Sequence, residues 1–139
     1  MKERELLELA AKAAGVFLTP DSMNRLFPRF VWDDGDAPTF ADGGWFGTVA
    51  WYGDDGKPGG TGKLLWSPLT DDGDSMRLAV ALRLDVLHND PQDNDSWVMA
   101  GSHIDHTEEV DGEASRAAAT RRAIVRAAAA IAESGEGHE

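Results

Sequence analysis

The chain has 139 residues, no cysteine and a formal net charge of −12 at pH 7. This length suits a single domain, and 42% hydrophobic with 27% charged residues is typical of a folded globular protein rather than a disordered one. Without cysteine there is no disulfide, thiolate zinc site or cysteine nucleophile. The negative charge argues against binding to nucleic acid or anionic membranes, and it is compatible with a basic protein surface as partner or with a simple role in solubility.

The first half of the chain predicts one helix followed by short strands. Residues 2–14 place apolar side chains at helical spacing, and Gly15 follows as a stop signal. One more helical turn is expected to begin at Asp21 and to end before Pro28. Three segments rich in aromatic and β-branched residues, separated by turns rich in Asp and Gly, are then expected to form antiparallel strands: Phe30–Trp32, Trp45–Tyr52 and Lys63–Trp66.

The second half begins with a predicted helix over about residues 72–83. Its buried face is expected to consist of apolar side chains at helical spacing: Met76, Ala79, Val80 and Leu82. Two more strands are expected over Asp85–His88 and Trp97–Ala100, joined by a polar loop. An acidic segment over residues 105–113 then leads to a last helix over about residues 114–133.

These elements predict an α/β (α+β) fold of one domain over residues 1–133, followed by a flexible tail over residues 134–139. Helices occur at both ends and in the middle of a strand-rich chain. We therefore expect a central, mostly antiparallel sheet packed by about three helices, which is an α/β/α-type sandwich.

The start of the middle helix combines several acidic residues with an extended approach. Asp71 is the expected N-cap residue, and Asp74 lies in the first turn, where a carboxylate faces the positive end of the helix dipole. Pro68 would hold the approach extended, and Trp66 would anchor it in the core. This structural interpretation accounts for the acidic cluster without a metal.

Several segments of the chain partly resemble motifs that bind calcium, phosphate or zinc. Counted from its Asp-rich turns, the twelfth position of a calcium-binding loop is never Glu, and the glycines before Lys63 do not match a phosphate loop. Residues 56–63 are therefore interpreted as a flexible hairpin connection. His88, His103 and Asp105 could form a zinc or iron site, or simply be exposed titrating residues. No metal or other cofactor is expected.

The arginines of the last helix lack partners within the helix. Arg122 and Arg126 stand four residues apart, so they repel each other. They can pair with acidic residues of the sheet loops, or they can present donors to an external anion together with Arg121. Arginines also interrupt the longest apolar run of the chain, so we expect no membrane span. The first residues carry charges of both signs and are not followed by an uninterrupted apolar region, so we expect no secretion signal. The expected location is the cytoplasm.

Three stretches carry a resemblance to a known family: Glu5–Gly15, Trp66–Val80 and Ala118–Ala129. Together they resemble the phage ABA sandwich domain family of small phage and prophage proteins. The resemblance implies an α/β sandwich, a phage or prophage source within a bacterial host cytoplasm, and no established biochemical activity. It does not extend to residues 16–62 and 88–113, whose loops are where a specific partner would be recognised.

Three functions are compatible with these observations. The first is a non-enzymatic accessory protein that binds a host or phage macromolecule, in host takeover or in countering a defence system. The second is a binder of a small anion, such as a nucleotide signal, that uses arginines of the last helix with Trp45 and Trp51 for stacking. The third, ranked last, is a metal-dependent hydrolase built on Asp and His residues. A homo-oligomer is compatible with each.

Overall fold

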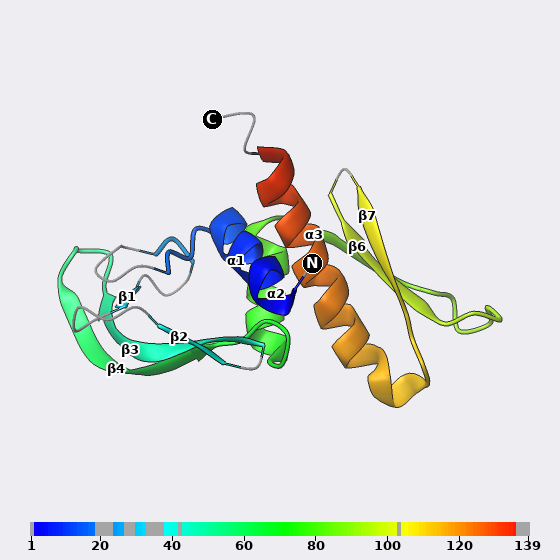
Figure 1. Cartoon of the computed structure of the whole chain (residues 1–139), viewed down its shortest axis with the longest axis horizontal. Helices are drawn as coiled ribbons and strands as arrows, with labels where there is room; N and C mark the ends of the chain where they lie inside the picture. Colours follow the sequence, from blue (N-terminus) through cyan, green and yellow to red (C-terminus); the bar gives the residue numbers. More distant parts are fainter. Residues whose placement is uncertain are drawn as a thin grey trace.

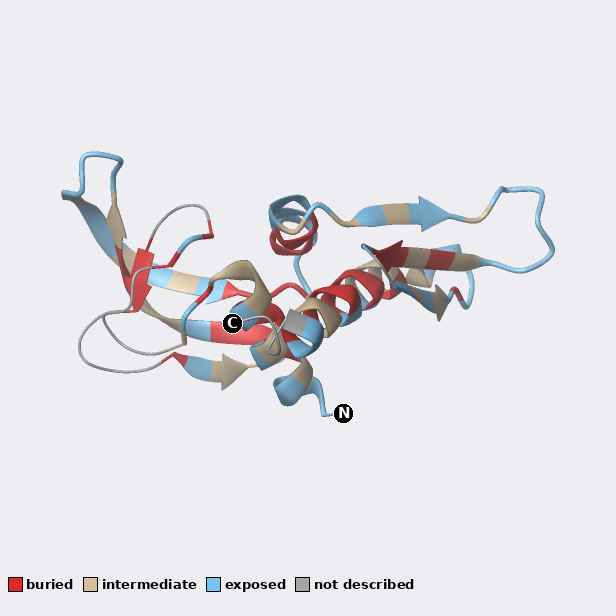
Figure 2. Ribbon diagram, turned by 90° about the horizontal axis from the view of Figure 1, so that it is seen from above, coloured by how far each residue is buried: buried red, intermediate tan, exposed pale blue. Residues whose placement is uncertain are grey.

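The computed structural model describes residues 2–18, 24–26, 30–32, 38–41, 43–102 and 104–135. Over these residues the chain forms three α-helices and two antiparallel β-sheets. Both views of the molecule place the helices between the two sheets (Figure 1; Figure 2). The predicted α+β class, with antiparallel strands and about three helices, is confirmed. The strands, however, form one sheet on each side of the helices, where the sequence predicted a single central sheet.

The four-stranded sheet supplies the aromatic side of the core. Its strands are β1 (Phe30–Trp32), β2 (Thr39–Ala41), β3 (Gly44–Tyr52) and β4 (Pro58–Trp66). The whole of β4 pairs with one edge of β3, while β1 and β2 pair with successive parts of its other edge. Because side chains alternate along a strand, Trp45, Val49 and the cross-strand neighbour Trp66 share one face, and all three are buried. Trp66 is thus a core residue, as predicted.

Two strands of this sheet differ from the prediction: β4 is longer than expected, and β2 was not expected. Most of residues 56–63, interpreted as a flexible hairpin connection, belongs to β4, and the turn itself covers only residues 54–57. The glycines suggested a loop, but Gly62 lies within the strand close to an aromatic ring: a Cβ there would lie 3.2 Å from the ring of Trp51, a tight contact. β2 (Thr39–Ala41) was not predicted because its three residues are too few to show a clear alternating pattern.

The first helix ends as predicted. α1 (Glu3–Ala14) stops at Gly15, whose N–H reaches the carbonyls of Ala11 and Lys12. The left-handed φ of 77° at Gly15 then turns the chain so that the N–H of Val16 donates to the Ala11 carbonyl at 2.8 Å. The helical turn expected between Asp21 and Pro28 lies largely outside the described residues.

The middle helix, α2 (Asp72–Ala81), lies where it was expected but buries a different face. Its buried residues are Asp74, Ser75, Leu78 and Ala79. Ala79 is buried, as predicted, but Met76 and Val80, also predicted to be buried, are 57% and 67% exposed, and Leu82 is only half-buried. The prediction followed the most apolar stripe, whereas the buried stripe includes Leu78 and Asp74, whose carboxylate accepts the Ser67 N–H of the preceding loop.

The three-stranded sheet consists of β5 (Asp85–His88), β6 (Trp97–Gly101) and β7 (Asp105–Glu109). β6 lies in the middle and is antiparallel to both neighbours. The first two strands agree with the prediction to within one residue. β7 was interpreted only as an acidic segment, because its side chains are polar on both faces, and its strand conformation depends on backbone pairing with β6.

A short 3₁₀ turn, η1 (Glu113–Ser115), leads into the last helix, α3 (Arg116–Gly135). Its start agrees with the prediction to within about a turn. Its end includes Ser134 and Gly135, which were assigned to the tail; residues 136–139 lie outside the described residues.

Helix α3 is the centre of the molecule. It contacts α1, α2, β6 and β7, and its buried positions include the consecutive runs 123–125 and 127–129. Burial of consecutive residues means that more than one face of the helix is covered. Ile124 is buried in the core, and the many alanines allow close approach from several sides. A helix covered on several sides can carry a sheet on each side, which explains why two sheets form instead of one.

Candidate binding surfaces

Asp71 is the N-cap residue of α2, as predicted. The Asp71 carboxylate accepts the N–H of Asp74 at 2.8 Å. The Asp74 carboxylate in turn accepts the Ser67 N–H at 2.8 Å and an Arg77 N–H at 3.0 Å. Burial raises the pKa of Asp74, although the Ser67 N–H and the Arg77 guanidinium act in the opposite sense. The neighbouring Pro68 is fully buried. These residues therefore hold the β4–α2 connection.

Arg122 and Arg126 share one partner. Both donate to the carboxylate of Glu108 on β7, Arg122 from Nε at 3.2 Å and Arg126 from Nη1. A single carboxylate with a 16% exposed side chain thus lies between two guanidiniums that would otherwise repel each other. The pairing agrees with the prediction of an intramolecular acidic partner, but the partner belongs to a strand rather than to a loop.

Arg121 faces the other side of α3. Its Nε donates to the carbonyl of Leu69 at 2.9 Å, and its Nη1 pairs with the Asp72 carboxylate. The side chain of Arg121 is 17% exposed, whereas that of Asp72 is 78% exposed. The guanidinium of Arg121 is therefore mostly enclosed by the protein, whereas the Asp72 carboxylate that pairs with it lies at the surface.

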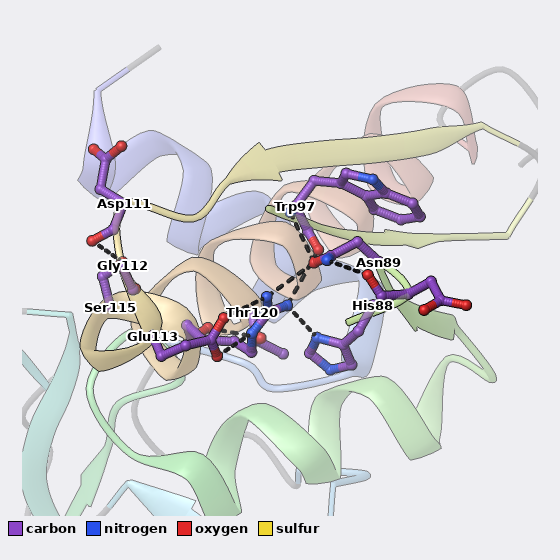
Figure 3. A network of polar contacts seen from close by, with 10 residues as sticks. His88, Asn89, Trp97, Asp111, Gly112, Glu113, Ser115 and Thr120 are labelled. Carbon is purple, nitrogen blue, oxygen red and sulfur yellow. Dashed lines mark hydrogen bonds and ion pairs between the residues drawn. The ribbon is translucent and has the colours of Figure 1, made fainter. Parts of the chain in front are cut away.

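Arg116 uses its guanidinium to tie α3 to the β5–β6 hairpin (Figure 3). Glu113 accepts from Nε at 2.9 Å and from Nη2 at 3.0 Å. Nη2 also donates to the side-chain oxygen of Asn89 at 2.9 Å, and Nη1 contacts the Trp97 carbonyl at 3.2 Å and His88 Nδ1 at 3.0 Å. The hydrogen bond from Arg116 lowers the pKa of Glu113. Because a guanidinium has five N–H groups, these contacts use them all and leave none for a ligand.

The two predicted tryptophans lie on the inner face of the four-stranded sheet. Trp45 is 2% exposed, and its ring meets Phe40 edge-on at 5.0 Å between centroids. Trp51, six residues further along the same face of β3, is half-buried. The predicted binding residues therefore lie in three surroundings: Arg121 of α3 beside α2, Arg122 and Arg126 of α3 against β7, and the tryptophans on the other sheet. The structure does not bring them together.

Residues 84–115 carry a strong charge imbalance. They contain no Lys or Arg and nine acidic residues: Asp85, Asp90, Asp93, Asp95, Asp105, Glu108, Glu109, Asp111 and Glu113. Two of them, Glu108 and Glu113, pair with arginines of α3. In the described part of the chain, the other seven form no ion pair, and all seven are exposed. The three-stranded sheet and its loops are therefore strongly acidic on their free surface.

The outer face of the three-stranded sheet combines this acidity with apolar side chains. Val98 and Ala100 of β6 are buried in the core with α3, so their neighbours along the strand, Trp97 and Met99, point away from it. Leu87, opposite Met99 on β5, is 51% exposed. Figure 1 shows all the helices on the other side of this sheet.

A hollow of about 740 Å³ lies over this outer face. Trp97, Met99 and Thr107 line it together with the acidic side chains of Asp95, Glu109 and Asp111. We call this surface, with Leu87 beside it, the acidic face. Its apolar centre and charged rim are the usual arrangement of a protein–protein interface. The acidic face was not predicted from the sequence, although the absence of Lys and Arg from residues 84–115 and the alternation in β5 and β6 indicate it.

Within the described ranges, no group of His, Asp and Glu side chains is arranged to hold a metal ion, and His103 of the conceivable zinc or iron site falls outside them. None of the described helices is long and apolar enough to cross a bilayer. Compared with protein-family models, curated proteins and solved structures, the chain gives no significant match.

Proposed function

We propose that this protein is a non-enzymatic binding protein of phage or prophage origin that binds a basic segment of a host or phage protein on its acidic face. The phage origin is supported by the resemblance of Glu5–Gly15, Trp66–Val80 and Ala118–Ala129 to the phage ABA sandwich domain family. The binding function is carried by one observation: a sheet face that no helix of the described chain covers, with apolar residues at its centre and carboxylates around it that form no ion pair with any described residue.

The size of the acidic face indicates a peptide segment rather than a whole domain. Three strands spaced about 4.8 Å apart and about five residues long give a face of roughly 14 by 17 Å. This is well below the roughly 800 Å² that each partner contributes to a standard protein–protein interface. A single extended or helical segment fits it, with apolar side chains over Met99 and Leu87 and Lys or Arg toward the rim.

The rim favours a cationic segment and disfavours an acidic one. Asp95, Glu109 and Asp111 lie around the hollow, and Asp90 and Asp93 extend the negative charge along the β5–β6 loop, which projects away from the helices in Figure 1. Complementary charge increases the association rate, and like charge across the interface opposes binding. Affinity for such a segment should therefore fall as salt concentration rises.

The test uses a fluorescein-labelled peptide in which Lys alternates with apolar residues, a Glu version of that peptide, and short polylysine. Fluorescence anisotropy should show binding of the Lys peptide, weaker binding of polylysine and no binding of the Glu peptide. Leu87→Ser should weaken binding of the Lys peptide about fivefold or more. The matched control is Leu65→Ser, since Leu65 is 46% exposed on the outer face of the other sheet.

Charge is tested by a second matched pair. The triple variant Asp95→Asn, Glu109→Gln, Asp111→Asn neutralises the rim. The control triple, Glu5→Gln, Glu8→Gln, Asp54→Asn, changes the net charge equally away from it. The rim variant should lose about tenfold in affinity and the control less than about twofold. Equal losses would mean general attraction to an acidic protein, and the proposal would be wrong.

A further inference from the structure

A groove of about 460 Å³ lies between α2 and α3, on a different part of the molecule from the acidic face. Asp72, Ser75 and Met76 form the α2 wall, while Ala117, Thr120 and Arg121 form the α3 wall. These positions are spaced three and four residues apart, so each wall is one face of its helix. A volume of this size is in the range of small-molecule sites.

The middle of the groove is apolar. Ile124 and Ala117 contribute side chains from α3, and Met76 of α2 lies at the edge with 57% of its surface exposed. Methionine is flexible and polarisable, so it can close over ligands of different outline. This placement accounts for an exposed Met76 on a helix that was expected to bury it.

Polar groups with unused hydrogen-bonding capacity lie around this apolar middle. The Ser75 hydroxyl is buried and has no hydrogen-bond partner within the described residues. His88 accepts from Arg116 at Nδ1, so its neutral ring carries the proton on Nε2, and Figure 3 shows the ring extending from the guanidinium toward α2. Buried polar groups without partners are rare in folded proteins, and the Ser75 hydroxyl is able to donate to or accept from a ligand in the groove.

Arg121 supplies a cation whose partner can be exchanged. Its Nε is fixed by the Leu69 carbonyl, its side chain is 17% exposed, and its contacts with described residues leave part of the guanidinium unused. Asp72, which now pairs with it, is 78% exposed and is held by that contact alone among the interactions of the described chain. A ligand carboxylate can displace an exposed partner of this kind at small cost, since such pairs contribute little in water.

We infer that this groove binds a small carboxylate with an apolar body, whose carboxylate takes the place of Asp72 at Arg121 while its apolar part lies against Met76 and Ile124. This site is independent of the acidic face. Arg116 takes no direct part, because its donors are all used by the protein.

The probes are 2-naphthoate and its neutral analogue 2-naphthalenemethanol, which share one apolar body. Binding is followed by NMR of ¹³C-methyl methionine, with the Met76 signal assigned from Met76→Leu. Naphthoate should shift the Met76 methyl signal at lower concentration than the alcohol does. Asp72→Asn should tighten naphthoate binding about two- to fivefold because it removes the competing carboxylate. Arg121→Gln should weaken it about tenfold or more.

The control is Arg122→Gln, on the β7 side of α3, which should leave naphthoate affinity unchanged. The opposite effects of Asp72→Asn and Arg121→Gln are specific to exchange at the guanidinium, and Asp72→Asn alone decides the matter if Arg121→Gln does not fold. The inference is wrong if naphthoate leaves the Met76 signal in place at millimolar concentration, if the alcohol binds equally well, or if Asp72→Asn fails to tighten binding.

Discussion

The substitution Arg122→Gln should have opposite effects on stability in the parent protein and in the Glu108→Gln variant. Glu108 has a 16% exposed side chain and accepts from both Arg122 and Arg126, whose side chains are 48% and 45% exposed. Pairs with one half-exposed partner are screened by solvent, so each contributes about 0.5–1 kcal/mol. Two arginines four residues apart on a helix repel each other by about 0.2–0.5 kcal/mol. Glu108→Gln should therefore cost about 1–2 kcal/mol.

The variant Arg122→Gln removes one charge and keeps most of the side-chain stem. In the parent protein it loses a pair and relieves the repulsion, so the net cost is about 0–0.8 kcal/mol. In the Glu108→Gln background there is no pair to lose and only the repulsion is relieved. The same change should then stabilise the protein by about 0.2–0.5 kcal/mol.

The measurement is a double-mutant cycle from urea unfolding, followed by tryptophan fluorescence, with a coupling energy of about 0.5–1 kcal/mol expected. In about 1 M NaCl, where the Debye length is about 3 Å, the coupling should shrink. Lys57→Gln, in the β3–β4 turn, serves as control and should have the same effect in both backgrounds. If Arg122→Gln destabilises both backgrounds equally, Glu108 does not hold this arginine and the ion-pair reasoning fails.

Three further predictions concern the β4–α2 connection and the sheet beside it. Asp71→Ala removes the N-cap of α2 and should cost about 1 kcal/mol in urea unfolding, whereas Asp71→Ser should restore most of the loss. Gly44→Ala would place a Cβ 1.9 Å from the Trp66 carbonyl oxygen and should lower the free energy of unfolding by about 3 kcal/mol or more. At Gly59, where the nearest atom is 3.6 Å away, the same change should cost less than about 1 kcal/mol. Equal costs at the two positions would contradict the packing argument. Burial raises the pKa of Asp74 in the folded protein above its ordinary 3.8, so the folded protein holds this proton more tightly than the unfolded chain does. Stability should therefore fall as pH rises from 3.8 through the raised pKa. Asp74→Asn should remove that part of the pH dependence, and an unchanged profile would show that Asp74 is not its source.

The sequence was most informative where local chemistry decides the structure. Gly15 as a helix stop, Asp71 as an N-cap and the strand Asp85–His88 all depend on residues close in the chain, and the structure has them as predicted. The face of α2 was predicted wrongly because Met76 and Val80 form the more apolar stripe. Which stripe is buried is decided by the contacts of Asp74 with the preceding loop and by α3, and neither follows from helical spacing alone.

The candidate sites depended still more on tertiary structure. Nothing in the local sequence shows that Arg122 and Arg126 meet Glu108, or that Arg116 reaches the β5–β6 hairpin. β7 lacks the apolar alternation that identifies a strand, so its place beside β6 in the acidic face could not be derived from periodicity. The charge imbalance of residues 84–115 and the alternation in β5 and β6 could be read directly from the chain.

That imbalance predicts opposite salt responses for stability and for binding. Of the nine acidic residues in residues 84–115, seven form no ion pair in the described part of the chain, so they repel one another in the free protein. Salt screens this repulsion, and the melting temperature of the free protein should rise between about 0.05 and 0.5 M NaCl. Affinity for the Lys peptide should fall over the same range, because the carboxylates that oppose folding are those that attract the cationic partner. In the rim triple variant both responses should become smaller together. If stability keeps its full salt dependence while peptide binding loses it, the repulsion arises elsewhere in the chain, and the acidic face is not its main source.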